Sequence, residues 1–591
     1  MTQRDKLYNI WFALKIIFCK APFVALGYLI FALTGAVFTA LQVLFLEKLI
    51  DEVYLMTEGA NMKSVIFSAA FYIVSVFLAQ IYTFTMSKMG RYLSRELTLK
   101  LSPEILDHLE RIEYCFFEDL RFNDVMNKMG DNPQQMIHNA FFSVVSCINS
   151  VMKLVGILLV FFRVSFSLGI GALMLGIPMA IIEVYSTDRQ QKLERENTLE
   201  KRKEKKIQGL VEDKNAILEF KVFGCFSYII MYWRKIRQLI IKRQKGITKR
   251  TIFFRLVICV IKIVYLGFVI VFLGNRLIAH LITIGTFISI VTSVEKMYAI
   301  LNTASYSLST LGARTYDISY YRQFLKFAQK SSGVGVLKST NYDIEFKNVH
   351  FSYPGIDEEV LKGISFKIEH GQCTALVGVN GAGKSTIIKL LCGLYKPTAG
   401  EILIGGMDIS DLTESELNKV CTVVFQDFGK YELTLRENVA LGNVSLMQDD
   451  EKLRMALKTA NFCEGDIALD QKLGHLFENG RELSGGQWQK VAIARTLLSA
   501  SDFLVMDEPT AALDPVAESR MYDTFTELTK GRGTVIISHR LASAKMADKI
   551  VVVEGGKVVE AGSHMFLMGK HGKYAEMFEM QRAWYEESCY E

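Results

Sequence analysis

Six long apolar segments constrain the fold of this chain more than any other feature of its sequence. They lie at roughly residues 21–46, 64–86, 136–161, 164–187, 251–278 and 282–310. A helix needs about 20 apolar residues to cross the hydrocarbon core of a bilayer. One such segment could be a buried core helix, but six of them before residue 311 predict membrane spans. The expected fold class of this part is a membrane all-α domain with six spans, and its expected surroundings are a lipid bilayer.

Charged residues divide the chain in two and orient the spans. Residues 1–341 carry 42 Lys and Arg against 25 Asp and Glu, whereas residues 342–591 carry 26 against 37. Basic residues crowd segments 87–135 and 188–250, and the loops that would lie on the opposite side are short and hold few of them. Cytoplasmic loops of membrane proteins are enriched in Lys and Arg. We therefore expect the N-terminus and both basic segments in the cytoplasm.

The pattern of the chain changes after the last apolar segment. A polar stretch containing "KSSGVG" is followed from residue 342 by short β-rich runs that alternate with helical ones. Such alternation is typical of an α/β domain with a largely parallel sheet. The expected division is a transmembrane domain at 1–311, a linker at 312–341 and an α/β domain at 342–591.

A glycine-rich loop stands between a predicted strand and a predicted helix in "CTALVGVNGAGKSTIIKLL". Its spacing, G-x4-G-K-S, is met by Gly378, Gly383, Lys384 and Ser385. Backbone amides at such a helix start wrap phosphate groups, and the helix dipole favours their charge. Lys384 would neutralise the β- and γ-phosphates, and Ser385 would offer its hydroxyl to Mg²⁺.

A second predicted strand, "FLVMDEP", ends in two acidic residues. Asp507 would hold Mg²⁺ directly or through water. Glu508 would polarise the attacking water as general base. The two motifs together predict that the α/β domain at 342–591 is a P-loop nucleotide-binding domain, because one supplies the phosphate cradle and the other the metal ligand and the base.

The order of motifs resembles that of the ATP-binding cassette (ABC) transporter family, and the layout of six spans and one cassette resembles an exporter half-transporter. Tyr353 resembles the aromatic residue that stacks on adenine, and Gln426 the glutamine that touches Mg²⁺ and signals to the membrane domain. Asp514 lies in a segment that resembles the family's loop across the dimer interface. His539 resembles the histidine that holds the γ-phosphate. "LSGGQ" at 483–487 is the family signature, and segments 116–125 and 216–226 resemble its coupling helices.

The resemblance implies three sets of site residues and two cofactors, ATP and Mg²⁺. The catalytic set is Glu508, His539 and Gln426, and the metal set is Ser385, Gln426 and Asp507. The ATP-binding set is Tyr353, Gly378, Asn380, Gly381, Gly383, Lys384, Ser385, Thr386, Ser484, Gly485, Gly486, Gln487 and Asp514. The implied activity is hydrolysis of ATP coupled to outward transport across a bacterial cell membrane, with no nucleic-acid partner.

The signature also implies a second subunit. Ser484, Gly485 and Gly486 precede another predicted helix, so they offer a second helix start to an anion. The resemblance implies that they meet the γ-phosphate of a nucleotide held by a partner half-transporter. No required catalytic residue is substituted, which favours a homodimer, and a heterodimer with a related chain remains open.

The transported substrate is less constrained. Polar residues within the spans usually face a cavity or one another. We therefore expect either a substrate cavity or a structural Lys–Glu pair among Asn149, Lys153, Lys262, Glu295, Tyr298 and Asn302. Trp488 follows the signature, and an aromatic residue at this position resembles the sequence of exporters of modified peptides such as lantibiotics. An aromatic residue there could also simply pack on the cassette. Peptide export is favoured, with lipid or lipid-linked cargo, drug efflux, and an ATP-gated channel or regulatory subunit as alternatives.

Overall fold

The computed structural model describes residues 2–58, 61–130, 132–329, 333, 335–337, 342–462, 467–475, 477–508, 531–538 and 541–587. The chain forms two compact units. The helical unit comprises Met1–Glu110 and Leu120–Phe327, and the α/β unit comprises Arg111–Asp119 and Ala328–Glu591. A short piece of chain between two helices of the first unit therefore belongs to the second. Each unit is described separately below.

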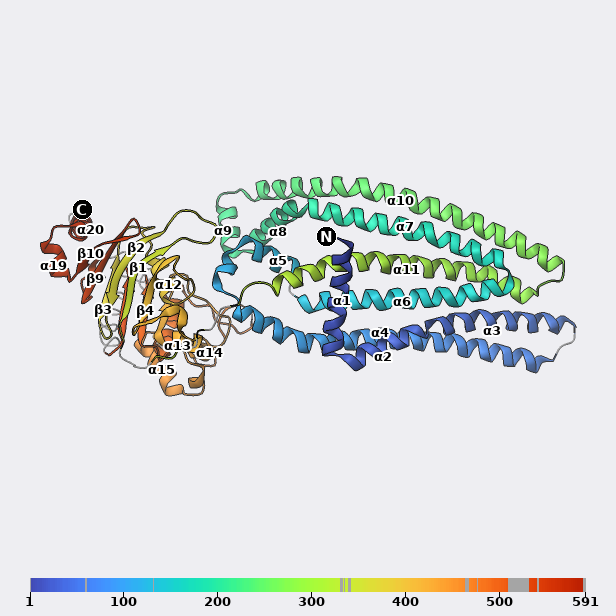
Figure 1. Cartoon of the computed structure of the whole chain (residues 1–591), viewed down its shortest axis with the longest axis horizontal. Helices are drawn as coiled ribbons and strands as arrows, with labels where there is room; N and C mark the ends of the chain where they lie inside the picture. Colours follow the sequence, from blue (N-terminus) through green and yellow to red (C-terminus); the bar gives the residue numbers. More distant parts are fainter. Residues whose placement is uncertain are drawn as a thin grey trace. The chain divides into compact units, whose positions relative to one another are not determined.

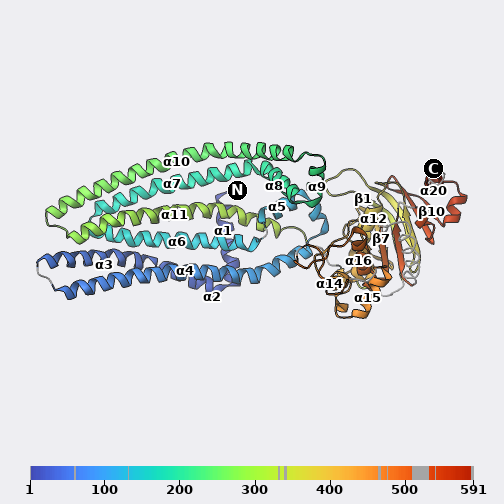
Figure 2. The ribbon, with the colours of Figure 1, turned by 180° about the vertical axis from the view of Figure 1, so that it is seen from behind.

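The helices of the helical unit are α1 (Gln3–Lys20), α2 (Pro22–Leu33), α3 (Gly35–Leu55), α4 (Met62–Arg111), α5 (Leu120–Met129), α6 (Pro133–Val164), α7 (Phe166–Glu196), α8 (Thr198–Glu212), α9 (Lys214–Val222), α10 (Phe226–Ile278) and α11 (Ile284–Phe324). The long helices, α3, α4, α6, α7, α10 and α11, run side by side, and α1 crosses them (Figures 1 and 2). Local sequence explains several of the helix starts. Pro133 occupies the first turn of α6, where its missing N–H costs nothing, and Thr283 caps α11 by accepting a hydrogen bond from the Thr286 amide.

The interior of the helical unit is an apolar cluster contributed by α3, α6, α7, α10 and α11. Phe161 of α6, Leu168 of α7, Leu273 of α10 and Met297 of α11 are buried there. Many equally apolar side chains face outward on the same helices, such as Leu159 of α6 and Val271 of α10. A helix that is apolar on both its inner and outer faces suits a lipid environment, because the outer face then meets hydrocarbon rather than water.

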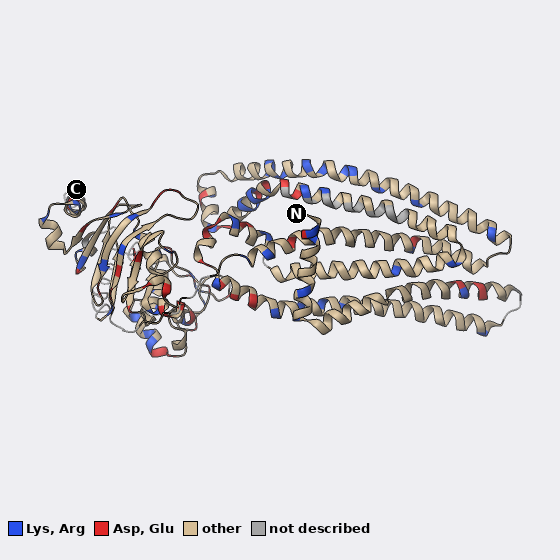
Figure 3. Cartoon of the chain, in the orientation of Figure 1, with Lys and Arg blue, Asp and Glu red and all other residues tan. Residues whose placement is uncertain are grey.

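Five stretches of the described residues are long and apolar enough to cross a membrane: Pro22–Leu55, Met62–Arg111, Pro133–Val164, Phe226–Ile278 and Ile284–Phe324. The remaining expected span, 164–187, falls in α7, where several side chains lie outside the description. Figure 3 shows long stretches of α4 and α6 without charged residues, and Lys and Arg spaced along α8 and one half of α10. Helix α11 continues to Phe324 and so includes the first part of the segment 312–341, which the sequence analysis assigns to a linker. That assignment stays a prediction.

The α/β unit contains two sheets. Strands β10, β9, β3, β8, β7 and β6 form a six-stranded sheet in that order, in which β9, β3, β8, β7 and β6 are parallel and β10 is antiparallel. Its strands are β3 (Cys373–Val377), β6 (Cys421–Val424), β7 (Phe503–Asp507), β8 (Gly533–Ile537), β9 (Lys549–Glu554) and β10 (Lys557–Gly562). The α/β fold with a largely parallel sheet is therefore confirmed.

A second, antiparallel sheet in the order β2, β1, β4, β5 was not expected from the sequence. Its strands are β1 (Ile344–Phe351), β2 (Leu361–Ile368), β4 (Ala399–Ile404) and β5 (Met407–Asp408). In β2, buried Leu361, Ile364, Phe366 and Ile368 stand among more exposed residues. This is the pattern of a strand with one face on the core.

Helices cover the two sheets of the α/β unit. They are α12 (Lys384–Leu391), α13 (Glu414–Val420), α14 (Leu435–Ala440), α15 (Asp450–Thr459), α16 (Gly485–Leu498), α18 (Leu541–Ala544), α19 (His564–Gly569) and α20 (Lys573–Glu587). Helix α12 packs with both sheets in one apolar cluster, through Ile387 and Leu391. Helices α14, α15 and α16 pack with β6 and β7 in another. The sheet edge carrying the site described next is therefore held by packed cores.

Candidate nucleotide-binding site

The glycine loop joins β3 to α12, as the sequence predicts. Residues 378–383 connect Val377, the last residue of the strand, to Lys384, the first of the helix. Gly383 is the N-cap of this helix, and its φ of 101° is a left-handed backbone conformation that residues with a side chain rarely adopt. A Cβ atom there would also lie 2.6 Å from Cδ2 of Leu361. Glycine is required at this point for both reasons, and the unpaired amides at the start of α12 remain open to an anion.

A cavity of about 420 Å³ lies above this loop. Its described lining is Val360, Asn380, Gly381, Gly383, Lys384, Ser385, Thr386, Gln426 and Glu508. Eight of these nine residues belong to the predicted sites. Val360, which immediately precedes β2, was missed because a single apolar residue before a strand carries no signal of a ligand.

The sheet explains why residues distant in sequence meet in this cavity. Parallel strands β3, β7 and β6 all end at one edge of the sheet, and ligands of open α/β sheets bind beyond the carboxyl ends of the strands. Glu508 directly follows β7, and Gln426 follows β6 by two residues. The Gln426 side-chain amide donates a hydrogen bond of 3.3 Å from Nε2 to Oε2 of Glu508.

Glu508 has an unusual backbone. Its φ is 51°, in the left-handed region that disfavours residues with a side chain. Its amide donates to the carbonyl of Ile537 at 3.1 Å, which ties it to the end of β8. Asp507, one residue earlier, is 6% exposed at the end of β7. Strained backbone held in place by its surroundings is typical of functional sites.

Lys384 is 5% exposed, and its ammonium donates to the carbonyls of Gly378 at 2.8 Å and Val379 at 2.9 Å. Burial lowers the pKa of this ammonium, and the carboxylates of Glu508 and Asp507 oppose that effect. A buried cation held by two carbonyls and facing two acids is positioned to receive a phosphate group.

Oxygen atoms suitable for Mg²⁺ surround the same cavity. Ser385 and Gln426 line it with a hydroxyl and an amide oxygen, and Asp507 precedes the lining residue Glu508. Mg²⁺ favours oxygen ligands and is commonly held by one or two protein groups together with phosphates. No group of three or more His, Cys, Asp or Glu side chains suited to a metal occurs within the described ranges. The residues present therefore fit a metal that is shared with a nucleotide.

Tyr353 lies beside the loop, within a cluster of aromatic rings. Its hydroxyl is 3.0 Å from the Thr386 hydroxyl, and its ring contacts Tyr395 edge-on, with the centroids 5.4 Å apart. Lys389, near the end of α12, lies over the Tyr353 ring at 5.2 Å. The structure thus places Tyr353 next to the phosphate loop but leaves its adenine-stacking role a prediction.

A segment that the sequence did not connect to this site contacts the same rings. Glu118, in the short 3-10 helix η2 (Tyr114–Glu118), accepts hydrogen bonds from Lys389 at 3.0 Å and from the Tyr395 hydroxyl. The Tyr114 ring packs edge-on against Tyr395. Of the expected coupling helix 116–125, residues up to Asp119 belong to the α/β unit, and those from Leu120 form α5 of the helical unit.

The signature residues start helix α16 elsewhere in the α/β unit. Ser484 caps this helix by accepting from the Gln487 amide, and the Gln487 side chain accepts from the Ser484 amide at 2.9 Å. Ser484, Gly485, Gly486 and Gln487 are not among the described residues lining the cavity. Asp514 and His539 lie outside the described residues.

Trp488 follows the signature and points into the core. It is 2% exposed and packs in the apolar cluster shared by α14, α15, α16, β6 and β7. Its side chain is therefore a core element of the α/β unit and offers no surface to a cargo.

The predicted substrate-cavity residues fall into two groups within the helical unit. On α10 and α11, the Lys262 ammonium lies 2.8 Å from a carboxylate oxygen of Glu295 and 4.3 Å from the centre of the Tyr298 ring. On α6, Asn149 accepts a hydrogen bond of 2.9 Å from the Tyr82 hydroxyl, and Lys153 lies 5.5 Å from the same ring. Asn302 is exposed on α11 and makes no side-chain hydrogen bond to another described residue.

A larger cavity, of about 1190 Å³, lies between α5, α8 and the end of α11, and it was not predicted. Lys128, Lys201 and Arg314 line it, each paired with a carboxylate. Lys205 and Lys206 also line it, without an ion pair inside the described part of the chain. The cavity therefore carries charges of both signs and an excess of positive charge.

Comparison with known proteins shows the family of this chain. A family profile described as "ABC transporter" matches residues 361–511. The chain is 31% identical to the subtilin transport ATP-binding protein SpaT of Bacillus subtilis over 495 residues, which cover 81% of this chain and 76% of that protein. The chain belongs to the ABC transporter family. It is an integral membrane protein and an ATPase coupled to transport, and its function is ATP-driven export.

Other relatives of this ABC transporter are named for different cargoes. It is 29% identical to the nisin transport ATP-binding protein NisT of Lactococcus lactis subsp. lactis, over 86% of each chain. It is 40% identical over 256 residues to the ATP-dependent lipid A-core flippase of Escherichia coli K12. These residues cover 43% of this chain and 44% of that protein. A bacterial Atm1-family ABC exporter with ATP bound has the same fold, with a TM-score of 0.75 at 24% identity, covering 94% of this chain and 98% of that one. The expected exporter half-transporter fold is confirmed.

Proposed function

We propose that two copies of this chain form an exporter of peptides, with the N-terminus and the α/β unit on the cytoplasmic side. ATP and Mg²⁺ are held between the glycine loop of one copy and the Ser484–Gln487 segment of the other. The similarity to NisT and SpaT, which extends over more than three quarters of the chain, carries this proposal.

The two-chain site is supported by the position of the signature residues. Ser484 and its neighbours form a capped helix start, which suits an anion, yet they do not line the cavity formed by their own glycine loop. A second chain would give that helix start a phosphate to bind. Because the required residues Lys384, Ser385, Asp507 and Glu508 are all present in this chain, two identical copies would form two complete sites.

The chemistry is hydrolysis of the bond between the β- and γ-phosphates. Lys384 and the amides of the loop neutralise the phosphate charge, and Glu508 accepts a proton from the attacking water. Gln426, bonded to Glu508 at 3.3 Å, orients that carboxylate. Mg²⁺, held by Ser385, Gln426 and Asp507, would supply further positive charge to the phosphates when bound. His539 and Asp514 are proposed from the family resemblance alone.

The cargo is proposed from the relatives and from the charged cavity. NisT and SpaT are named for the transport of nisin and subtilin. The cavity between α5, α8 and α11 carries Lys205 and Lys206 beside several ion pairs, which suits a polar chain better than an apolar drug. Lys262, Glu295 and Tyr298 are proposed as a structural cluster, since the Lys and Glu charges already satisfy one another.

Lipid or lipid-linked cargo is the second candidate, because of the similarity to the lipid A-core flippase. That similarity covers 43% of this chain, so it extends over much less of the sequence than the similarity to the peptide transporters. Drug efflux and a channel or regulatory role remain as outcomes that the same experiment separates.

The test is accumulation of cargo in inside-out vesicles that contain this protein. Vesicles are incubated with a cell extract and ATP, and mass spectrometry identifies compounds enriched over vesicles of a Glu508→Gln variant. The variant should bind ATP and turn it over at a rate lower by at least about a hundredfold. Enrichment of a peptide supports the proposal, whereas enrichment of a lipid or drug, or ATP turnover without any enrichment, overturns it. Near-normal turnover by Glu508→Gln would remove Glu508 from the role of base.

A further inference from the structure

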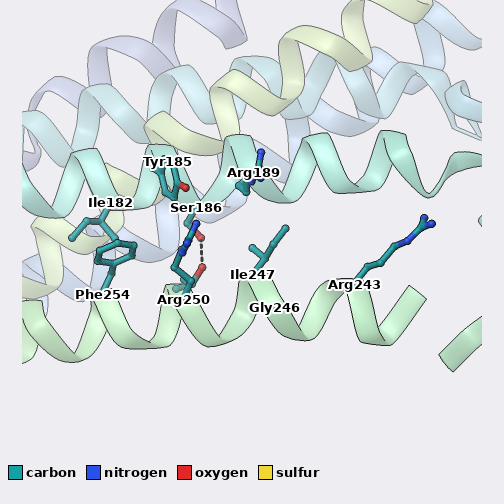
Figure 4. A pocket seen from close by; sticks show the side chains of 10 residues that line it. Ile182, Tyr185, Ser186, Arg189, Arg243, Gly246, Ile247, Arg250 and Phe254 are labelled. Carbon is teal, nitrogen blue, oxygen red and sulfur yellow. Dashed lines mark hydrogen bonds between the residues drawn. The ribbon is translucent and has the colours of Figure 1, made fainter. Parts of the chain in front are cut away.

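An open pocket of about 280 Å³ lies between α7 and α10 of the helical unit, away from the nucleotide site (Figure 4). Its α7 side is formed by residues 182, 185, 186 and 189, and its α10 side by residues between 243 and 254 that are three, four or seven positions apart. Residues at these spacings share one face of a helix. The pocket is therefore a groove between one face of α7 and the opposite face of α10.

The lining changes from apolar to basic along the groove. Ile182, Tyr185 and Phe254 form one end, where the rings of Tyr185 and Phe254 meet edge-on with centroids 6.5 Å apart. Arg189 and Arg243 lie towards the other end. In the middle, the hydroxyls of Ser186 and Thr251 are 3.1 Å apart, and Figure 4 shows the Arg250 side chain reaching towards Ser186.

The three guanidinium groups of the pocket differ in their partners. Arg243 donates to Asn197 at 2.7 Å and lies 3.5 Å from a carboxylate oxygen of Glu200, so its charge is engaged. Arg189 and Arg250 have no ion pair within the described ranges, and none of the ten described lining residues is acidic. The side chains of Glu183 and Asp188 lie outside the description. The described pocket thus presents two positive charges that a bound anion would neutralise.

The groove sits where both helices change from apolar to charged sequence. Residues 166–182 of α7 contain no charged residue, and the basic segment begins at Arg189. On α10, Lys245, Lys249 and Arg250 precede the largely apolar stretch that starts at Thr251, in which Arg255 is the one charged residue before Lys262. Basic residues are enriched at the cytoplasmic ends of membrane spans, so a change of this kind is expected at the boundary between hydrocarbon and headgroups. Basic pockets between transmembrane helices at that level bind anionic headgroups.

We propose that this pocket binds the headgroup of an anionic phospholipid. Arg189 and Arg250 pair with its phosphate, and Ile182 and Phe254 contact the start of its acyl chains. The Ser186 and Thr251 hydroxyls share one hydrogen bond, so the hydroxyl that accepts it can donate its own hydrogen to the phosphate. A soluble phosphate would meet the same arginines but would leave the apolar end of the groove unused. The bound lipid is a resident component between two helices, so this inference does not depend on which cargo is exported.

Gly246 offers a way to close the pocket without disturbing its charges. It lines the groove on α10, and a Cβ atom added there would have no atom within 4 Å. The Cβ atom of Gly246→Phe therefore meets no neighbour, and its ring, which extends from a residue that lines the pocket, would occupy the volume assigned to the headgroup. An exposed glycine within a helix is also a destabilising residue, so its replacement should not impair folding.

The experiment is native mass spectrometry of the purified full-length protein after addition of dioleoylphosphatidylglycerol. Dioleoylphosphatidylcholine, which has the same acyl chains and no net charge, is the matched lipid control. Four proteins are compared: the wild type, Arg189→Gln/Arg250→Gln, Gly246→Phe, and Lys249→Gln, which removes a charge at the same level of α10 but outside the pocket lining. A competition arm adds glycerol 3-phosphate, the soluble counterpart of the headgroup.

The wild type and Lys249→Gln should retain the anionic lipid in preference to the neutral one. The double arginine variant and Gly246→Phe should each lose that retention by about tenfold. Equal retention by all four proteins, or a loss as large in Lys249→Gln as in the double variant, overturns the proposal. Displacement of the lipid by an equal concentration of glycerol 3-phosphate would assign the pocket to a free anion and would also overturn it.

Discussion

The ammonium of Lys389 lies 3.0 Å from a carboxylate oxygen of Glu118, which joins the last turn of α12 to a segment 271 residues earlier in the chain. Helix α12 begins at the phosphate-binding Lys384, and Lys389 also lies over the ring of Tyr353. Tyr353 in turn contacts the Thr386 hydroxyl. The segment Arg111–Asp119 is thus connected through three side chains to the loop that would hold the nucleotide.

Replacing Glu118 with Gln should weaken the coupling of ATP hydrolysis to transport. The amide keeps the shape of the side chain but removes the charge that Lys389 pairs with. Because the pair is partly exposed, we expect a stability loss of no more than about 1 kcal/mol. Basal ATP turnover should persist, while transport in vesicles falls by about fivefold. The measurement is transport per ATP hydrolysed.

Glu113→Gln is the matched control for this prediction. Glu113 lies in the same segment, and its carboxylate is 3.6 Å from the Lys396 ammonium, without the additional bond to a tyrosine that Glu118 has. Its replacement should change transport per ATP less than Glu118→Gln does. Equal effects of the two variants would show that charge in the segment, and not the Glu118 contact, matters.

The Glu118 contact should also depend on pH. Burial would raise the pKa of this carboxyl, but hydrogen bonds from Tyr395 and Lys389 outweigh that effect and hold it below its ordinary value of 4.5. A carboxyl whose pKa is lowered by folding stabilises the folded state above its unfolded pKa, and the stabilisation is lost as the pH falls through the folded pKa. The difference in thermal stability between wild type and Glu118→Gln should be constant from neutral pH down to about 4.5 and shrink below it. A difference that grows on acidification contradicts this assignment.

Mixed dimers should separate the one-chain and two-chain versions of the ATP site. Lys384→Ala disables the glycine loop, and Ser484→Arg disables the helix start of the signature, so each homodimer should be inactive. A dimer purified by one tag on each variant has one site with both defects and one intact site. It should hydrolyse ATP at about half the wild-type rate. Mixed dimers as inactive as the parents would place both elements in a site formed by one chain.

Lys262 and Glu295 should behave as a structural pair. Lys262→Glu puts two carboxylates together between α10 and α11 and should lower the melting temperature, with a loss of about 1 kcal/mol. The double substitution Lys262→Glu/Glu295→Lys restores opposite charges and should recover most of that loss. If the double variant is stable but transports nothing, the two residues contact the cargo, and their assignment as a structural cluster is wrong.

Trp488→Ala should destabilise the α/β unit. Its side chain is almost fully buried, and removing a buried tryptophan leaves a cavity that costs about 3–5 kcal/mol. A thermal unfolding scan should show the loss, whereas Met455→Ala, at a residue that is 69% exposed on α15, should show little. A change of cargo selection by Trp488→Ala at unchanged stability would return this residue to the role suggested by its sequence context.

Features that depend on neighbouring residues could be predicted from the sequence. The strand, loop and helix around Lys384 follow from local glycine spacing and apolar runs, and the end of β7 at Asp507 follows from the apolar run before it. The pairing of Ser484 with Gln487 also follows from local sequence, since Ser followed three residues later by Gln is the signature of a capping box.

Features that depend on distant contacts could not be predicted. Glu118 meets Lys389 and Tyr395 only because the chain leaves α4, contacts the α/β unit and then returns to α5. No periodicity in residues 111–119 records partners more than 270 positions away. The α7–α10 pocket has the same origin, because Arg189 and Arg250 share a groove through the pairing of two helices, whereas the sequence presents them as ordinary members of a basic segment.

The left-handed backbone of Glu508 lowers the stability of the fold at the residue that is proposed to act in catalysis. Glycine or asparagine would adopt a φ of 51° at lower cost than glutamate does, so the fold itself favours replacing the residue that is proposed to activate water. A laboratory evolution experiment that rewarded only heat resistance would therefore tend to replace Glu508. The resulting variants would be more stable but would have lost the proposed general base, so selection for stability alone would work against ATP hydrolysis.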